Sequence, residues 1–67
     1  MTRTEIQNLY IRVCRDSGWQ MDYIEAAKLA ARVGGFHPMD VWIAMPSLST
    51  MREIAHGDHP ACQRIAA

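Results

Sequence analysis

The chain has no excess of charge of either sign, because seven Lys and Arg residues balance seven Asp and Glu residues among its 67 residues. Proteins devoted to nucleic-acid binding usually carry a basic excess, since contacts with phosphates supply most of their affinity. The balanced composition therefore argues against that class. It leaves DNA binding open only if the basic residues gather on one face.

Cysteine and long apolar runs are also scarce. Cys14 and Cys62 are too few for a disulfide framework, so we expect both thiols to be reduced. No stretch reaches the roughly 20 apolar residues that span a membrane, and the N-terminus lacks the apolar run of a signal peptide. We therefore expect a soluble, cytoplasmic protein with no membrane partner.

Large apolar side chains are few, since the chain has one Phe, two Trp and two Tyr residues and is rich in alanine. A hydrophobic share of 49% is nevertheless too high for a disordered chain. A chain this short forms one domain, here residues 1–67, with a core that gains little free energy per buried alanine. The small core also favours a homodimer.

Three capping-box patterns, each an Asp or Thr followed three residues later by Glu, predict helix starts. They are Thr2 with Glu5, Asp22 with Glu25, and Thr50 with Glu53. Helix ends are predicted at Gly18 and at the Gly34–Gly35 pair, and Pro38 suits a first helical position. We predict an all-α fold, a compact bundle of about four short helices over residues 3–16, 22–33, 38–45 and 50–56, with residues 57–67 as a tail or a short terminal helix.

Helical spacing of apolar residues predicts which faces are buried. In the first helix these are Ile6, Tyr10 and Val13, with Leu9 and Cys14 beside them. In the second helix they are Tyr23, Ala26, Ala27, Ala30 and Val33, with Leu29 beside them.

Residues 29–45 read Leu-Ala-Ala-Arg-Val-Gly-Gly-Phe-His-Pro-Met-Asp-Val-Trp-Ile-Ala-Met. The segment resembles the helix-turn-helix motif of small bacterial and phage regulators, at the level of the superfamily and of no specific family. The resemblance implies that Gly35 is the turn glycine and that Pro38 opens a second helix whose inner face carries Val41, Ala44 and Met45. The inner Leu-Ala pair of the segment departs from the pattern: either Ala30 and Ala31 replace it, or Leu29 and Ala30 do with one residue inserted.

The resemblance implies that the third helix is a recognition helix, with outward residues His37, Met39, Asp40, Trp42 and Ile43. That helix has none of the Arg, Lys, Asn or Gln side chains that usually read bases in the major groove. Asp40 is able to accept a hydrogen bond from cytosine, but it repels phosphates. Met39, Trp42 and Ile43 are apolar, and Trp is enriched in the hot spots of protein interfaces. A core position is the equal alternative for Trp42.

His56, His59 and Cys62 follow one another at a spacing of three, and all three are competent zinc ligands. Zinc sites usually pair two such clusters, and the chain has one, so we expect no cofactor and a solvated C-terminal tail. The Gly34–Gly35 pair lacks the Lys and Ser or Thr of a phosphate loop. A helical domain of this size also has little room for a substrate cavity, so we expect no catalytic residue.

Two hypotheses follow. The first is a small non-enzymatic regulatory or inhibitory protein that occupies the working surface of another protein. Its anchors are Met39, Trp42 and Ile43, with Tyr23 and Trp19 as secondary anchors. The alternative is a dimeric helix-turn-helix transcriptional regulator, with His37 and Asp40 near the bases and phosphate contacts from Arg12, Arg15, Lys28, Arg32 or Arg52. Solvated helix faces are the other interpretation of these basic residues.

Overall fold

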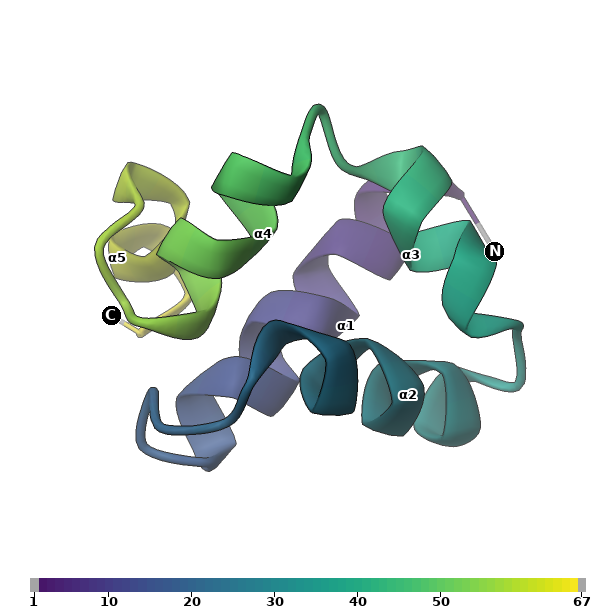
Figure 1. Cartoon of the computed structure of the whole chain (residues 1–67), viewed down its shortest axis with the longest axis horizontal. Helices are drawn as coiled ribbons and strands as arrows, with labels where there is room; N and C mark the ends of the chain where they lie inside the picture. Colours follow the sequence, from purple (N-terminus) through teal and green to yellow (C-terminus); the bar gives the residue numbers. More distant parts are fainter. Residues whose placement is uncertain (1, 67) are drawn as a thin grey trace.

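Five helices make up the described part of the chain: α1 (Arg3–Asp16), α2 (Tyr23–Gly34), α3 (Pro38–Ala44), α4 (Leu48–Ala55) and α5 (Pro60–Ala66). The computed structural model describes residues 2–66, and their side chains up to Gln63. These residues contain helices and no strand, which confirms the predicted all-α class. The molecule measures 24 × 21 × 20 Å, and α1 packs against each of the other four helices (Figure 1).

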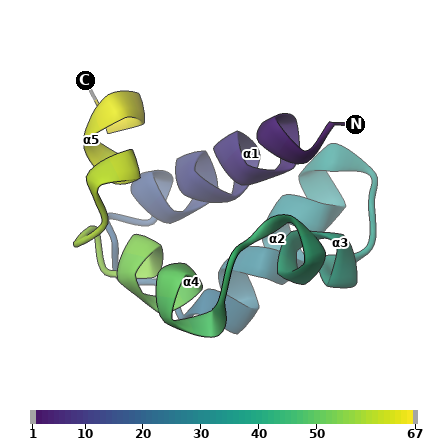
Figure 2. The ribbon, with the colours of Figure 1, turned by 90° about the horizontal axis from the view of Figure 1, so that it is seen from above.

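The view from above places the short helices around α1 (Figure 2). Helix α5 lies toward the C-terminal end of α1, and α3 lies toward its N-terminal end. The Arg3 Nε donates a hydrogen bond to the Ala44 carbonyl at 3.0 Å, and the Gln7 Nε2 donates to the same oxygen. The last turn of α3 is therefore held by side chains of the first two turns of α1.

Local capping explains where α1 and α2 begin. The Thr2 hydroxyl accepts a hydrogen bond from the Glu5 N–H at 3.2 Å, and the Glu5 carboxylate accepts from the Thr2 N–H, which confirms the predicted capping box. The Asp22 carboxylate caps α2 by accepting from the Ile24 N–H at 3.3 Å. Helix α2 then ends at Gly34, because Gly35 adopts a left-handed conformation with φ 75°.

The predicted start of the fourth helix was wrong. Ser47, and not Thr50, caps α4, since the Ser47 hydroxyl accepts from the Thr50 N–H at 3.2 Å. The two hydroxyls lie 3.1 Å apart, so Thr50 sits inside the first turn that Ser47 begins. At the C-terminus, the helical alternative for the tail is the one observed, as α5.

The core forms where the inner faces of the helices meet α1. Helix α1 buries the predicted Ile6, Tyr10, Val13 and Cys14, and it also buries Ile11. Helix α2 contributes four alanines, which allow its backbone to approach closely: Ala26, Ala27, Ala30 and Ala31. The other helices add Val41, Ala44, Met51, Ile54, Ala55, Ala61 and Cys62, and the α3–α4 connection adds Met45.

One core position predicted for α2, Val33, was wrong. Val33 is 64% exposed, because the stripe of alanines faces the core and leaves Val33 at its edge. Leu29, one turn earlier on the same side of α2, is half-buried. The edge of α2 is thus apolar and partly open to solvent.

A buried hydrogen bond links α1 to α4. The Tyr10 hydroxyl donates to the Met51 carbonyl at 2.7 Å, and the Tyr10 side chain is fully buried. The bond satisfies the hydroxyl in the core, where an unpaired polar group would be costly.

Candidate functional site

Helix α3 begins with a complete cap. The His37 Nδ1 accepts a hydrogen bond from the Met39 N–H at 3.0 Å, and the Asp40 carboxylate accepts from the His37 N–H at 3.1 Å. Pro38 occupies the first turn, as expected. The two polar residues assigned to bases in the DNA hypothesis therefore hold the start of the helix.

The two faces of α3 differ sharply in exposure. Val41 is fully buried, whereas Met39 is 56% and Ile43 is 69% exposed. At about 100° of rotation per residue, Met39, Trp42 and Ile43 fall within an arc of about 100° opposite Val41. We call Met39, Trp42 and Ile43 the α3 surface. Two of the three predicted anchors thus lie largely in solvent.

Trp42 lies at the edge of the α3 surface and is half-buried. Its ring meets the ring of Tyr23 on α2 edge to face, with centroids 5.8 Å apart and an interplanar angle of 66°. The Arg52 guanidinium on α4 lies 5.2 Å from the centroid of the Tyr23 ring, a cation–π contact. Trp42 therefore belongs both to the packing between helices and to the rim of the surface.

Trp19, the other secondary anchor, lies far from α3. It belongs to the connection between α1 and α2, at the opposite end of the molecule from α3 (Figure 1). Its backbone has a φ of 62°, and its ring packs over Gly57 in the connection between α4 and α5. Trp19 thus joins two loops, and the structure does not bring it to the α3 surface.

A hollow of about 220 Å³ adjoins the α3 surface. Ile43, Ala44 and Asp40 line it from α3, and Arg3 and Ile6 line it from α1. Sequence reasoning missed the part played by Arg3 and Ile6, because their position beside α3 depends on how α1 and α3 pack. Ile43 is therefore both a protruding side chain and the wall of a neighbouring depression.

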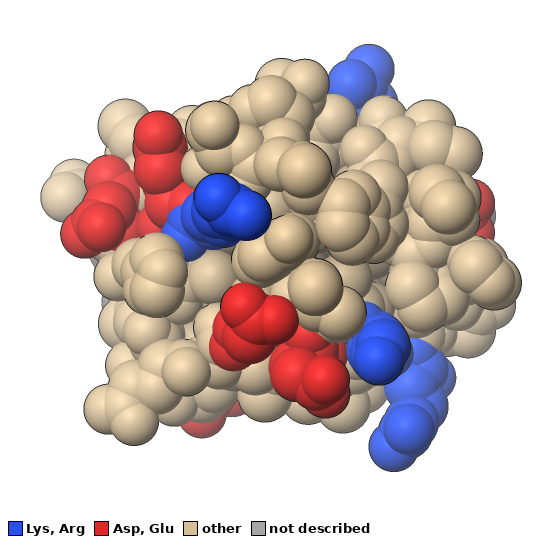
Figure 3. Space-filling model, in the orientation of Figure 1, with Lys and Arg blue, Asp and Glu red and all other residues tan. Residues whose placement is uncertain are grey.

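The five basic residues expected to contact phosphates are spread over three helices: Arg12 and Arg15 on α1, Lys28 and Arg32 on α2, and Arg52 on α4. In the face that Figure 3 shows, Lys and Arg appear at separate places, some beside Asp and Glu, and the surface over α3 is largely uncharged. Lys28 lies 4.0 Å from Glu25 on α2, and Arg15 lies 3.3 Å from Asp16 on α1. These contacts between neighbours on one helix fit ordinary solvated positions.

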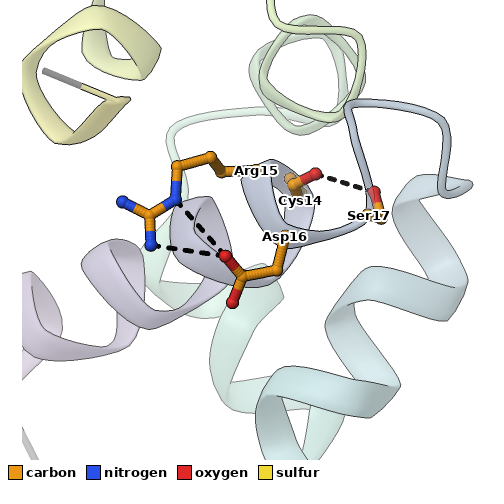
Figure 4. A network of polar contacts seen from close by, with 4 residues as sticks. All are labelled: Cys14, Arg15, Asp16 and Ser17. Carbon is orange, nitrogen blue, oxygen red and sulfur yellow. Dashed lines mark hydrogen bonds and ion pairs between the residues drawn. The ribbon is translucent and has the colours of Figure 1, made fainter.

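The C-terminal end of α1 is held by local polar contacts (Figure 4). The Arg15 guanidinium bonds Asp16 Oδ1, and the Ser17 hydroxyl donates to the Cys14 carbonyl at 2.7 Å. Asp16 also borders a groove between α1 and α2.

The histidine and cysteine cluster has local roles in the fold. The His59 Nδ1 accepts from the Ala61 N–H at 3.1 Å at the start of α5. Cys62 is buried, with its Sγ 3.6 Å from the Ile54 carbonyl. Within the part of the chain that the structure describes, no group of three His, Cys, Asp or Glu side chains is arranged to hold a metal ion.

Both thiols are free and buried. Burial raises the pKa of Cys14 to about 11, and it also raises the pKa of Cys62. Burial likewise raises the pKa of the Tyr10 hydroxyl. Raised thiol pKa values lower the fraction of reactive thiolate, so these cysteines behave as small apolar core residues.

Comparison with known proteins gives no match: no family model, no curated protein and no solved structure is similar to the chain. Among residues 2–66, no helix combines the length and the apolar character that a membrane crossing requires. The function of the chain therefore has to be inferred from the geometry of the α3 surface.

Proposed function

We propose that this protein is a small non-enzymatic regulatory or inhibitory protein that binds another protein through the α3 surface. The observation that carries the proposal is the exposure of Met39 and Ile43, two large apolar side chains side by side on one short helix. Fully burying such a side chain contributes about 1.5–3 kcal/mol. A partner that covers both therefore gains a compact apolar anchor.

The hydrogen bonds that hold both ends of α3 favour a role of its surface in binding. The His37–Asp40 cap holds its first turn, and the bonds from Arg3 and Gln7 to the Ala44 carbonyl hold its last turn. A surface held in place before binding loses little conformational entropy on binding, which raises affinity. Steric occupation of the partner's working surface would then suffice for inhibition, with no chemical step.

The neighbouring side chains suit the rim of such an interface. Trp42, Tyr23 and Arg52 lie in a row across three helices, and these residue types are enriched among interface hot spots. Asp40 is the only charged residue of α3. The surface thus combines an apolar centre with an aromatic and cationic edge.

A DNA-binding transcriptional regulator is the second candidate, favoured by one observation. Helices α2 and α3 pack together and are joined by only three residues, 35–37, as in a helix-turn-helix. Its phosphate contacts would come from Arg12, Arg15, Lys28, Arg32 or Arg52. Against it stand the single acidic charge of α3 and the distribution of these cations over three helices.

Capture from an extract of the source cells tests the proposal with three immobilised proteins: the natural chain, Ile43→Asp and Val33→Asp. Val33 is a matched control, because it is 64% exposed and lies on α2 and not on α3. We expect a protein that the natural chain and Val33→Asp retain and that Ile43→Asp loses. Equal retention by all three chains, or no specifically retained protein, would contradict the proposal.

Affinity measurements then separate the two candidates. For the purified partner, we expect Ile43→Asp to weaken binding at least about tenfold, with little dependence on salt. A labelled DNA duplex of mixed sequence tests the DNA-binding alternative. Tight binding to it that falls steeply with salt and is lost on Arg32→Ala, while Ile43→Asp has no effect, would establish the DNA-binding alternative.

A further inference from the structure

A second apolar depression lies between α1 and α2, away from the α3 surface. This groove has a volume of about 320 Å³, and Leu9, Val13, Met21, Leu29 and Val33 form its apolar lining. It shares no residue with the α3 surface or with the hollow beside it. Val33, the residue expected in the core, stands at its edge and is 64% exposed.

Two charges of opposite sign border the groove. Arg12 and Asp16 both line it and lie four residues apart on α1, a rise of about 6 Å along the helix axis. Asp16 bonds Arg15 in an exposed contact (Figure 4). Among the residues whose side chains are described, Arg12 has no ion-pair partner. The groove is thus apolar inside, with one cation and one anion in sequence along one wall.

We infer that this groove is the surface through which two copies of the chain pair. A two-fold axis that sets the two α1 helices antiparallel reverses the order of the charges along the wall. Arg12 then faces Asp16 of the partner subunit, and Asp16 faces Arg12 of the partner subunit. The same rotation brings the two apolar linings together, as a self-complementary interface requires.

The order of charges selects a second copy over other occupants. A uniformly acidic ligand would meet Asp16, and a uniformly basic one would meet Arg12, so each would gain one attraction and one repulsion. A second copy satisfies both positions at once. Pairing also covers Val33, and it adds buried apolar surface to a chain whose size limits what its own core buries.

The dimer places α1 and α2 of each copy in a four-helix arrangement and leaves the α3 surface outside it. The inference therefore goes beyond the proposed function and stands apart from it.

Sedimentation equilibrium from about 10 μM to about 1 mM, the range of weak to moderate affinity, tests the pairing. The natural chain should shift from its monomer mass of 7.6 kDa toward twice that value. Val33→Asp should remain monomeric, and Ile43→Asp should dimerise like the natural chain. A monomer at every concentration would overturn the inference, as would a dimer that Ile43→Asp abolishes and Val33→Asp retains.

Charge exchange tests the antiparallel geometry itself. Arg12→Glu and Asp16→Arg each place like charges across the axis, so each should weaken dimerisation at least about tenfold. An equimolar mixture of the two variants should form heterodimers with about the natural affinity, because every facing pair is then again of opposite sign. The double variant with both changes should also recover.

The two exchanged residues are exposed, so both variants should fold, and circular dichroism provides the check. Weak dimerisation of both single variants with no recovery in the mixture would refute the antiparallel pairing. Ile43→Asp should lose partner capture and keep the dimer, and Val33→Asp should lose the dimer and keep partner capture. A failure of the capture result alone would overturn the proposed function, and a failure of the dimer result alone would overturn this inference.

Discussion

Replacing Val41 or Ile43 by alanine tests the division of α3 into a structural face and a binding face. The two residues lie two positions apart on one short helix, yet Val41 is fully buried and Ile43 is 69% exposed. If Ile43 serves a partner and not the fold, its removal should leave the stability of the isolated chain nearly unchanged. The removal of Val41 should not.

The magnitudes follow from exposure. Val41→Ala removes two buried carbons at about 0.8 kcal/mol each and leaves a small cavity, which together cost about 2 kcal/mol. The higher helix propensity of alanine offsets about 0.5 kcal/mol of this loss of stability. Ile43→Ala removes three carbons, but only about a third of the Ile43 side chain is covered, so the lost burial costs about 0.7 kcal/mol. The higher helix propensity of alanine offsets part of this cost as well. The expected losses are about 1.5 kcal/mol and about 0.3 kcal/mol.

Urea denaturation followed by circular dichroism measures both changes, and thermal denaturation provides a second readout. For a domain of this size, the loss in Val41→Ala corresponds to a fall in Tm of about 10 °C. The m-value should stay constant in both variants. If Ile43→Ala costs as much as Val41→Ala, then Ile43 belongs to the core and the α3 surface is not a free binding face.

Three further predictions concern two core residues and the end of α2. Tyr10→Phe removes the buried bond to the Met51 carbonyl and should cost about 1 kcal/mol of unfolding free energy in urea; an unchanged stability would show that the bond contributes nothing. Because the pKa of Cys14 is raised from 9.0 to about 11, the unfolded chain loses this proton first as pH rises. The contribution of Cys14 to the free energy of unfolding should therefore be constant below about pH 9 and fall by about 2–3 kcal/mol toward pH 11. Urea denaturation at several pH values should show a smaller fall for Cys14→Ala. Gly34→Ala adds a Cβ that overlaps the Phe36 ring, so it should lower the Tm although alanine favours a helix; a raised Tm would refute this close packing.

Helix starts illustrate which features local sequence decides. The Thr2–Glu5 box was predicted correctly because every atom in it belongs to four consecutive residues. The start of α4 was predicted wrongly because Ser47 and Thr50 are both competent caps, and the pattern with Glu53 favoured the later one. The earlier hydroxyl forms the cap, and the helix gains two residues before Thr50.

Which side chains point into the core and which toward solvent was harder to predict. Val33 has the spacing of a core residue, but the close approach of α2 through its alanines leaves it at the edge of the groove. Trp42 is neither a core residue nor a free anchor, because Tyr23 covers one side of its ring. Trp19 was predicted to be a secondary anchor, but its ring packs over Gly57 and lies away from the α3 surface.

Sequence alone determined that this chain is all-α, where α1 and α2 begin, and that α3 carries apolar residues and one acidic charge. These properties depend on capping, turns and composition within a few residues. Tertiary structure alone decided which apolar residues remain in solvent and that Arg12 and Asp16 border the groove against α2. The reason is that exposure and grooves arise where helices distant in the sequence meet, and the angle and closeness of that meeting depend on packing of the whole core.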